Sequence, residues 1–129
     1  VGVDEQNVMA AVSQSMSEAQ MKDIAEWAAG LETTAMFDHS KASDLPGFQV
    51  YETTCLDCHS SFMGRLITGS PNLESLSPDY LVRQLHLFRN GSRHFKSPTK
   101  HQTKMMKVVK DLSEVDFANL NAFIKSAMP

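Results

Sequence analysis

The chain has 129 residues with 42% hydrophobic content, which is enough to bury one core. Its formal net charge is −3 and its 12 lysines and arginines are scattered along the sequence, so we do not expect a nucleic-acid-binding protein, which needs a concentrated basic surface. No apolar run approaches the roughly 18 residues of a membrane-spanning helix, and the N-terminus lacks the layout of a signal peptide. We therefore expect a mature chain that does not span a membrane.

The first predicted helix lies near the N-terminus. Ser17 and Gln20, three residues apart, form the capping-box pattern of a helix start. Apolar side chains then recur at helical spacing at Met21, Ile24, Ala28 and Leu31. This spacing predicts an amphipathic helix, and its apolar side, which also carries Trp27, needs a surface to pack against.

The next segment is polar and has the composition of a linker. Residues 32–46 read ETTAMFDHSKASDLP and end in a proline. We therefore expect two parts in this chain. Residues 1–44 form an N-terminal helical extension with its linker, and residues 45–129 form the main domain.

A second helix is expected just before the two cysteines of the chain. Phe48 and Tyr51 lie three residues apart and so share one helical face. The helix leads directly into Cys55 and Cys58, which are followed at once by His59. The only two thiols therefore stand beside an imidazole.

Two further helices have clear boundaries. Ser77 as N-cap, Pro78 in the first turn and Gly91 past the end bound one of them, and the other begins at Ser113 with Asp116 three residues later. The apolar faces are expected to hold Leu81, Leu85 and Phe88 in the former and Phe117, Leu120, Phe123 and Ile124 in the latter. Because no stretch alternates as a strand does, we predict an all-α fold.

The stretch between these two helices is polar, and we expect it to be a loop. It spans residues 90–111, contains Gly91 and Pro98, and includes the consecutive methionines Met105 and Met106. A thioether sulfur is a weak, uncharged metal ligand, which makes this segment a candidate donor. Either methionine taken alone is also typical of a core position.

The Cys-x-x-Cys-His motif has four interpretations. A zinc site needs four ligands, but there is no second cysteine pair, and the spacing of His86, His94 and His101 fits no ordinary zinc site. A redox dithiol usually lies in a βαβ pattern, which this sequence lacks, and a structural disulfide would close only a very short loop. The fourth interpretation is covalent haem, in which both thiols bond to the porphyrin and His59 is the proximal ligand.

Residues 45–129 resemble a class I cytochrome c domain, and the pattern is most similar to bacterial dihaem cytochromes of the c4 type and their single-haem relatives. The resemblance rests on GFQVYETTCLDCH, on PNL at 71–73, on YLVRQLHLFRNGSR at 80–93 and on MMKVVKDLSEVDFANLNAFI at 105–124. It implies an all-α class I cytochrome c fold with one haem c bound covalently through Cys55 and Cys58.

The same resemblance implies the remaining site residues. In such proteins the methionine ligand precedes the Leu-Ser of the last helix by seven residues, which gives Met105, with Met106 as the runner-up. The carbonyl of Pro71 is expected to accept a hydrogen bond from the ring of His59 and so to fix its tautomer. His94 or His101 replacing the methionine is the alternative. We interpret His39 and His86 as surface or hydrogen-bonded histidines.

An internal repeat marks the N-terminal segment. Residues 9–31 align without gaps onto residues 105–127, so that Met9 falls on Met105 and Trp27 on Phe123. Residues 1–31 thus resemble the C-terminal part of a second, incomplete cytochrome c domain, with truncation, erosion and a swapping element as possible origins. Homodimerisation through residues 8–31 is one hypothesis. Met9 is expected to ligate nothing, because the chain has no second Cys-x-x-Cys-His motif.

These features predict a one-electron carrier and no enzyme, with a His/Met-ligated haem c, metal ligands His59 and Met105, and no catalytic residue. The resemblance implies redox protein partners and a periplasmic location. The acidic balance of the chain favours partners with basic surfaces. The alternatives are an electron-transfer domain or fragment of a larger dihaem or multidomain oxidoreductase, and a haem enzyme or sensor with an open or displaceable sixth ligand.

Overall fold

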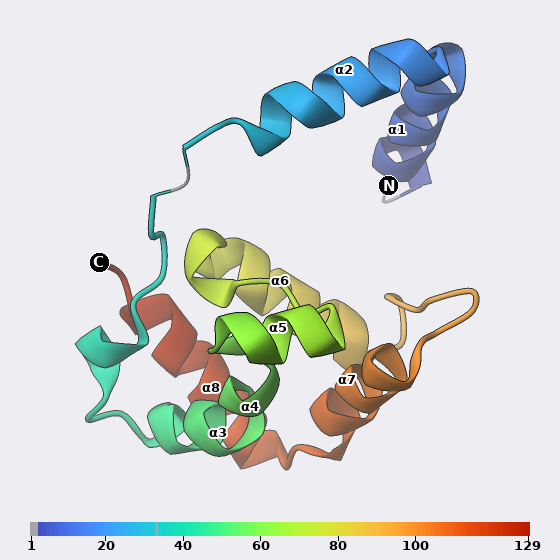
Figure 1. Cartoon of the computed structure of the whole chain (residues 1–129). Coiled ribbons are helices and arrows are strands. Elements are labelled where there is room, and N and C mark those ends of the chain that lie inside the picture. Colours follow the sequence, from blue (N-terminus) through green and yellow to red (C-terminus); the bar gives the residue numbers. More distant parts are fainter. Residues whose placement is uncertain (1–2, 33) are drawn as a thin grey trace. The chain divides into compact units, whose positions relative to one another are not determined.

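A computed structural model describes residues 3–32 and 34–129 of the chain (Figure 1). Within these ranges all regular secondary structure is helical, which confirms the predicted all-α class. The chain divides into two compact units between Thr33 and Thr34. Each unit is described by itself.

The first unit is a pair of helices, α1 (Val3–Ser15) and α2 (Glu18–Ala29). The predicted capping box starts α2, because Ser17 Oγ accepts a hydrogen bond from the Gln20 amide at 3.2 Å and Gln20 Oε1 accepts one from the Ser17 amide at 2.9 Å. None of the α2 side chains is buried, and Trp27 is 68% exposed. The predicted amphipathic helix is therefore present, with its apolar side uncovered within its own unit.

The second unit contains six α-helices and two short 3₁₀ helices within the described residues 34–129. In chain order they are η1 (His39–Ala42), α3 (Pro46–Thr54), α4 (Leu56–His59), α5 (Phe62–Thr68), η2 (Leu73–Ser75), α6 (Pro78–Arg89), α7 (Lys100–Asp111) and α8 (Glu114–Ser126). Helix α8 packs against α3 and α6, and α7 packs against α6.

Local signals define the ends of α6 and α8 as predicted. Ser77 Oγ accepts the Tyr80 amide at 3.2 Å, and Ser113 Oγ accepts the Asp116 amide at 3.0 Å. Gly91, just beyond α6, has a φ of 79°, which side-chain-bearing residues adopt only with strain. These caps satisfy amides that the helices themselves leave unpaired.

The core forms where α3 crosses α8. At Gly47 a Cβ atom would lie 2.0 Å from the carbonyl oxygen of Asn119, so only glycine permits the two helices to approach this closely. Phe37, Tyr51 and Phe123 pack together here, with ring centroids 5.5 Å apart between Phe37 and Tyr51 and 5.3 Å apart between Tyr51 and Phe123. Both Phe37 and Phe123 are completely buried.

The structure corrects the predicted linker at residues 32–46. Phe37 and Ala42 belong to the core of the second unit, and the amide of Asp38 donates to the carbonyl of Ala127 at 2.9 Å. The second unit therefore begins at Thr34, and the expected boundary after residue 44 falls inside it. The polar composition of the segment concealed this, because only a few of its residues, Phe37 and Ala42 among them, are apolar and buried.

The loop predicted at residues 90–111 is also wrong over most of its length. Helix α7 occupies Lys100–Asp111 and begins with a capping box in which Thr99 Oγ1 accepts the Gln102 amide at 3.2 Å and the Gln102 side chain accepts the Thr99 amide at 2.9 Å. Its apolar residues Met105, Met106 and Val109 lie on or in the core. The lysines between them gave the sequence its polar appearance.

The helix pair α1–α2 has nearly the same element boundaries as the pair α7–α8. With the repeat offset of 96 residues, the end of α1 at Ser15 falls on the end of α7 at Asp111, and the start of α2 at Glu18 falls on the start of α8 at Glu114. The internal repeat of the sequence is thus a repeat of local structure.

Among the residues that the structure describes, no helix combines the length and apolar character that crossing a bilayer requires.

Candidate functional site

The Cys-x-x-Cys-His motif begins at Cys55, directly after α3, and its Cys58 and His59 belong to the short helix α4. The carbonyl of Cys55 accepts hydrogen bonds from the amides of Cys58 at 3.3 Å and His59 at 3.1 Å. The two cysteines are not joined to each other by a disulfide. Backbone hydrogen bonding therefore fixes the two sulfur-bearing residues and the imidazole relative to one another.

The ring of His59 is oriented by Pro71. Its Nδ1 lies 2.9 Å from the Pro71 carbonyl oxygen, and because a carbonyl only accepts, Nδ1 carries the proton. The neutral ring therefore has its lone pair on Nε2. The hydrogen bond expected from the sequence between these two residues is present, and it gives the tautomer that a metal ligand needs.

Burial sets the protonation of the motif. Burial lowers the pKa of His59, and the hydrogen bond to Pro71 acts in the opposite direction. Burial also raises the pKa of the Cys55 thiol to about 12, and the neighbouring Cys58 adds to this shift. The imidazole is thus neutral and the Cys55 thiol protonated near pH 7.

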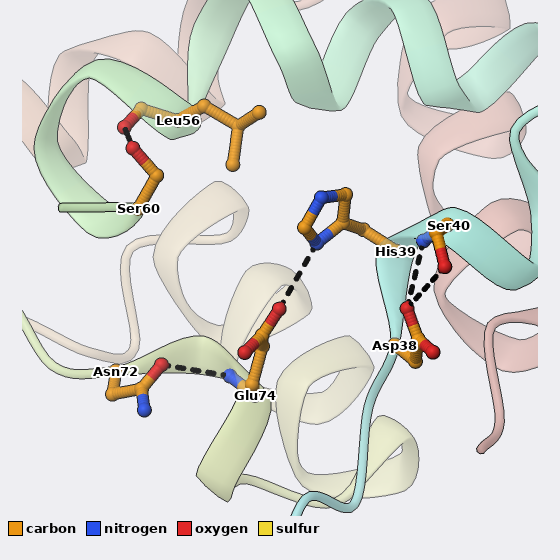
Figure 2. A network of polar contacts seen from close by, with 7 residues as sticks. All are labelled: Asp38, His39, Ser40, Leu56, Ser60, Asn72 and Glu74. Carbon is orange, nitrogen blue, oxygen red and sulfur yellow. Dashed lines mark hydrogen bonds and ion pairs between the residues drawn. The ribbon is translucent and has the colours of Figure 1, made fainter.

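A polar network supports the segment next to His59 (Figure 2). His39 Nδ1 lies 3.1 Å from Glu74 Oε1, and the Glu74 amide donates to Asn72 Oδ1 at 3.2 Å. The backbone carbonyl of Glu74 accepts the amide of Met36 at 2.8 Å. The network ties the start of the second unit to the loop that contains Pro71, and it confirms that His39 is a hydrogen-bonded histidine.

A cavity of about 340 Å³ adjoins the motif. Cys55 and His59 form part of its wall, and Met105 of α7 also lines it. Apolar side chains of the remaining wall come from α3, α6 and α8 and include Tyr51, Leu81, Leu85, Phe88, Leu120 and Ile124. The cavity therefore has a sulfur atom and an imidazole in an otherwise largely apolar pocket.

The polar groups on this wall are neutral or cationic. Arg93, His101, Gln84 and Gln102 line the cavity, and no acidic residue is found among its described lining residues. The guanidinium of Arg93 lies 4.6 Å from the centre of the Phe88 ring, and its Nη1 donates to Gln84 Oε1 at 2.5 Å. This arrangement favours a large apolar ligand that carries negative charge at one edge.

Most of the predicted site residues are brought together at this cavity. Cys55, His59, Pro71 and Met105 all line it, whereas Cys58 is half-buried beside it and is not part of the described wall. Met106 is also absent from that wall, and of the alternative histidines only His101 is present. Sequence reasoning gave no role to Gln84 and Phe95, which also line the cavity, and no local signal marks either residue.

Other metal-binding arrangements are not formed by the described residues. Within residues 3–32 and 34–129, no group of three or more His, Cys, Asp or Glu side chains lies close enough to hold a metal ion. His94 is exposed on the loop before α7, and His86 packs edge-on against Phe117 at 5.0 Å between ring centroids.

The family model for cytochrome c matches residues 45–128, which is well over half of the chain. This chain belongs to the cytochrome c family. Neither a search of curated proteins nor a search of solved structures returned a match. Members of this family carry covalent haem c and transfer electrons with redox partners.

The residues at the cavity of this cytochrome c domain fit haem c. Cys55 and Cys58 supply the two thiols of the attachment motif, and His59 supplies a neutral imidazole with its lone pair on Nε2. The apolar wall suits a porphyrin, and Arg93 suits its carboxylates, since no acidic residue competes for this cation among the described lining residues.

Proposed function

We propose that this cytochrome c is a one-electron carrier whose haem is attached through Cys55 and Cys58 and ligated by His59 and Met105. The observation that carries the proposal is that His59 and Met105 line one apolar cavity from different helices. The bound haem supplies an iron that changes between the ferrous and ferric states. The protein contributes a fixed ligand set and a largely water-free environment.

Different residues of the chain hold the two proposed iron ligands, His59 and Met105. Pro71 holds the proton of His59 on Nδ1, which keeps Nε2 available as a ligand in both oxidation states. Met105 is held by α7, and the neighbouring Met106 and Val109 anchor that helix to the core. A methionine sulfur held in this way favours the ferrous state and raises the reduction potential.

Absorption spectroscopy of matched variants tests the ligand assignment. Met105→Ala is expected to remove the weak red charge-transfer band of ferric Met-ligated haem and to lower the reduction potential. Met106→Leu, which removes a thioether outside the described cavity wall and keeps an apolar side chain of similar volume against the core, is the control and is expected to keep the band. Loss of the band in Met106→Leu alone would assign the ligand to Met106, and absence of the band from the wild type would rule out methionine ligation.

The alternative of a haem enzyme or sensor depends on His101, because this side chain also lines the cavity. In that case Met105→Ala leaves the spectrum unchanged, and His101→Ala alters it. We favour the carrier because Met105, whose thioether is able to ligate iron, lines the same cavity as His59.

We further propose that residues 1–31 are the C-terminal part of a second, incomplete cytochrome c domain of the c4 type, so that the protein acts with or within a larger oxidoreductase. The coincident boundaries of α1–α2 and α7–α8 support this proposal. Attachment of haem to Cys-x-x-Cys-His takes place outside the energy-transducing membrane in this family, and we therefore propose a periplasmic location. A fusion to a reporter that is active only after export tests the location.

A further inference from the structure

The side chains of His39 and Glu74 join two segments that are far apart in the sequence. His39 Nδ1 lies 3.1 Å from Glu74 Oε1 (Figure 2), and because a carboxylate only accepts hydrogen bonds, the His39 ring is the donor. The side chains are 34% and 46% exposed. A polar pair with this much exposure adds little to global stability, so its effect is expected to be local.

The segment that carries His39 is fixed in the core. Phe37 is completely buried, and the amide of Asp38 donates to the carbonyl of Ala127 at 2.9 Å. The ring of His39 stacks on Phe48 with 6.5 Å between the ring centroids. His39 therefore offers the loop on the other side of the pair a firm point of attachment.

The loop that carries Glu74 is held at several atoms. The carbonyl of Glu74 accepts the amides of Met36 at 2.8 Å and Phe37 at 3.3 Å. The amide of Glu74 donates to Asn72 Oδ1 at 3.2 Å, and Asn72 directly follows Pro71. A continuous set of hydrogen bonds thus connects the core with the residue next to Pro71.

Pro71 transmits the position of this loop to the iron ligand. Its carbonyl oxygen lies 2.9 Å from His59 Nδ1. His39, Glu74 and His59 also line one small cavity of about 40 Å³, which has room for water. If the loop moves away from the ring, water is able to replace the Pro71 carbonyl as the acceptor of the ring proton.

We propose that His39 and Glu74 are positioning residues of the haem site, whose hydrogen bond keeps the Pro71 carbonyl on the ring of His59. The proposal deepens the proposed electron-carrier function and rests on it, because His59 is the iron ligand there. A carbonyl held firmly on Nδ1–H makes the imidazole more basic, which stabilises ferric iron. Loss of the pair is therefore expected to raise the reduction potential.

Hydrogen exchange of the His59 ring proton, followed by NMR of the reduced holoprotein, tests the positioning. His39→Phe keeps an aromatic ring beside Phe48 and removes the donor, and it is expected to accelerate this exchange at least about tenfold. The amide of the buried Leu120 reports global unfolding and is expected to accelerate less than about threefold. Equal acceleration at both protons would show a purely structural pair and would overturn the proposal.

The reduction potential separates positioning from charge. His39→Phe and Glu74→Ala are both expected to shift the one-electron equilibrium about threefold toward ferrous iron, which is about 30 mV upward. Loss of the carboxylate charge alone raises the potential only in Glu74→Ala, because His39→Phe retains that charge. An unchanged or lowered potential in His39→Phe would contradict positioning.

Conservative variants provide the rescue. Glu74→Gln keeps an acceptor oxygen and is expected to restore slow exchange to within about twofold of the wild type. His39→Asn keeps an N–H group on Cγ, as in the His39 ring, and is expected to restore both exchange and potential. Exchange as fast in these variants as in His39→Phe would overturn the role of the hydrogen bond.

A neighbouring variant and the wild type complete the test. Ser40→Ala removes a hydrogen bond to Asp38 and leaves the pair of His39 and Glu74 intact, so both readouts are expected to stay unchanged. A wild type in which His59 does not ligate the iron would refute the carrier function itself. A His59-ligated wild type in which no variant changes either readout would refute the positioning role alone.

Discussion

The helix pairs α1–α2 and α7–α8 have the same local plan and opposite burial. Ser17 and Ser113 cap the second helix of each pair, and Trp27 occupies the position that Phe123 occupies 96 residues later. Phe123 is completely buried, whereas Trp27 is 68% exposed. The comparison shows that capping and apolar spacing form the helices, and that a crossing partner such as α3 decides whether their apolar faces become a core.

The largest expected difference between the pairs concerns these aromatic residues. Phe123→Ala is expected to destabilise the cytochrome c domain by about 3–5 kcal/mol, because it leaves a cavity among Phe37, Phe48 and Tyr51. Trp27→Ala is expected to change stability by less than about 0.5 kcal/mol, as an exposed position should. Denaturant unfolding followed by the haem absorbance measures both.

Sedimentation of the wild type and of the Trp27→Ala variant tests whether a second copy of the chain covers α2. If a second copy covers α2, as the dimer hypothesis states, the wild type sediments as a dimer and the variant dissociates. A monomeric wild type at high concentration would end that hypothesis.

Removing the matched N-caps of α2 and α8 is expected to have a smaller effect on stability, and the effect is expected to be local in α2 and global in α8. Ser113→Ala is expected to cost about 1 kcal/mol of global stability, because α8 is part of the domain core. Ser17→Ala removes the equivalent bond from α2, and its cost is expected to appear only as local helix fraying. Amide hydrogen exchange separates the two outcomes, and a global change in Ser17→Ala would show that α2 is coupled to the domain.

The smallest expected effect concerns Asp38, where the second unit begins to pack. Hydrogen bonds from the side chain and the amide of Ser40 lower the pKa of Asp38 below its usual value. A depressed folded pKa stabilises the fold at neutral pH, and this contribution is lost as the pH falls through that pKa. Titration of the Asp38 carboxyl carbon by NMR is expected to show a low midpoint, which rises in Ser40→Ala. An unchanged midpoint in the variant would show that the Ser40 hydroxyl does not lower the pKa.

Sequence reasoning succeeded where a signal is local. The caps at Ser17, Ser77 and Ser113 and the motif at residues 55–59 are read from adjacent residues, and the structure contains each of them. The all-α class follows from these helices together with the absence of strand-like alternation.

Sequence reasoning failed where tertiary packing decides the outcome. The segment around Phe37 reads as a polar linker, yet its single phenylalanine lies at the centre of the core. Helix α7 was missed because its lysines obscured the apolar positions Met105 and Val109, although the Thr99 capping box offered a usable signal. The lining role of Gln84 depends on how α6 faces the cavity, which no short pattern reveals.

The close contact at Gly47, where α3 crosses α8, also indicates which side chains would pack against α2. Gly47 faces the backbone of Asn119, and Tyr51 follows one helical turn later against Phe123. By the 96-residue offset, Asn119 and Phe123 correspond to Asp23 and Trp27 of α2. On the proposal that residues 1–31 belong to a second cytochrome c domain, a helix that packs on α2 as α3 packs on α8 would present a glycine to Asp23 and, four residues later, a large side chain to Trp27.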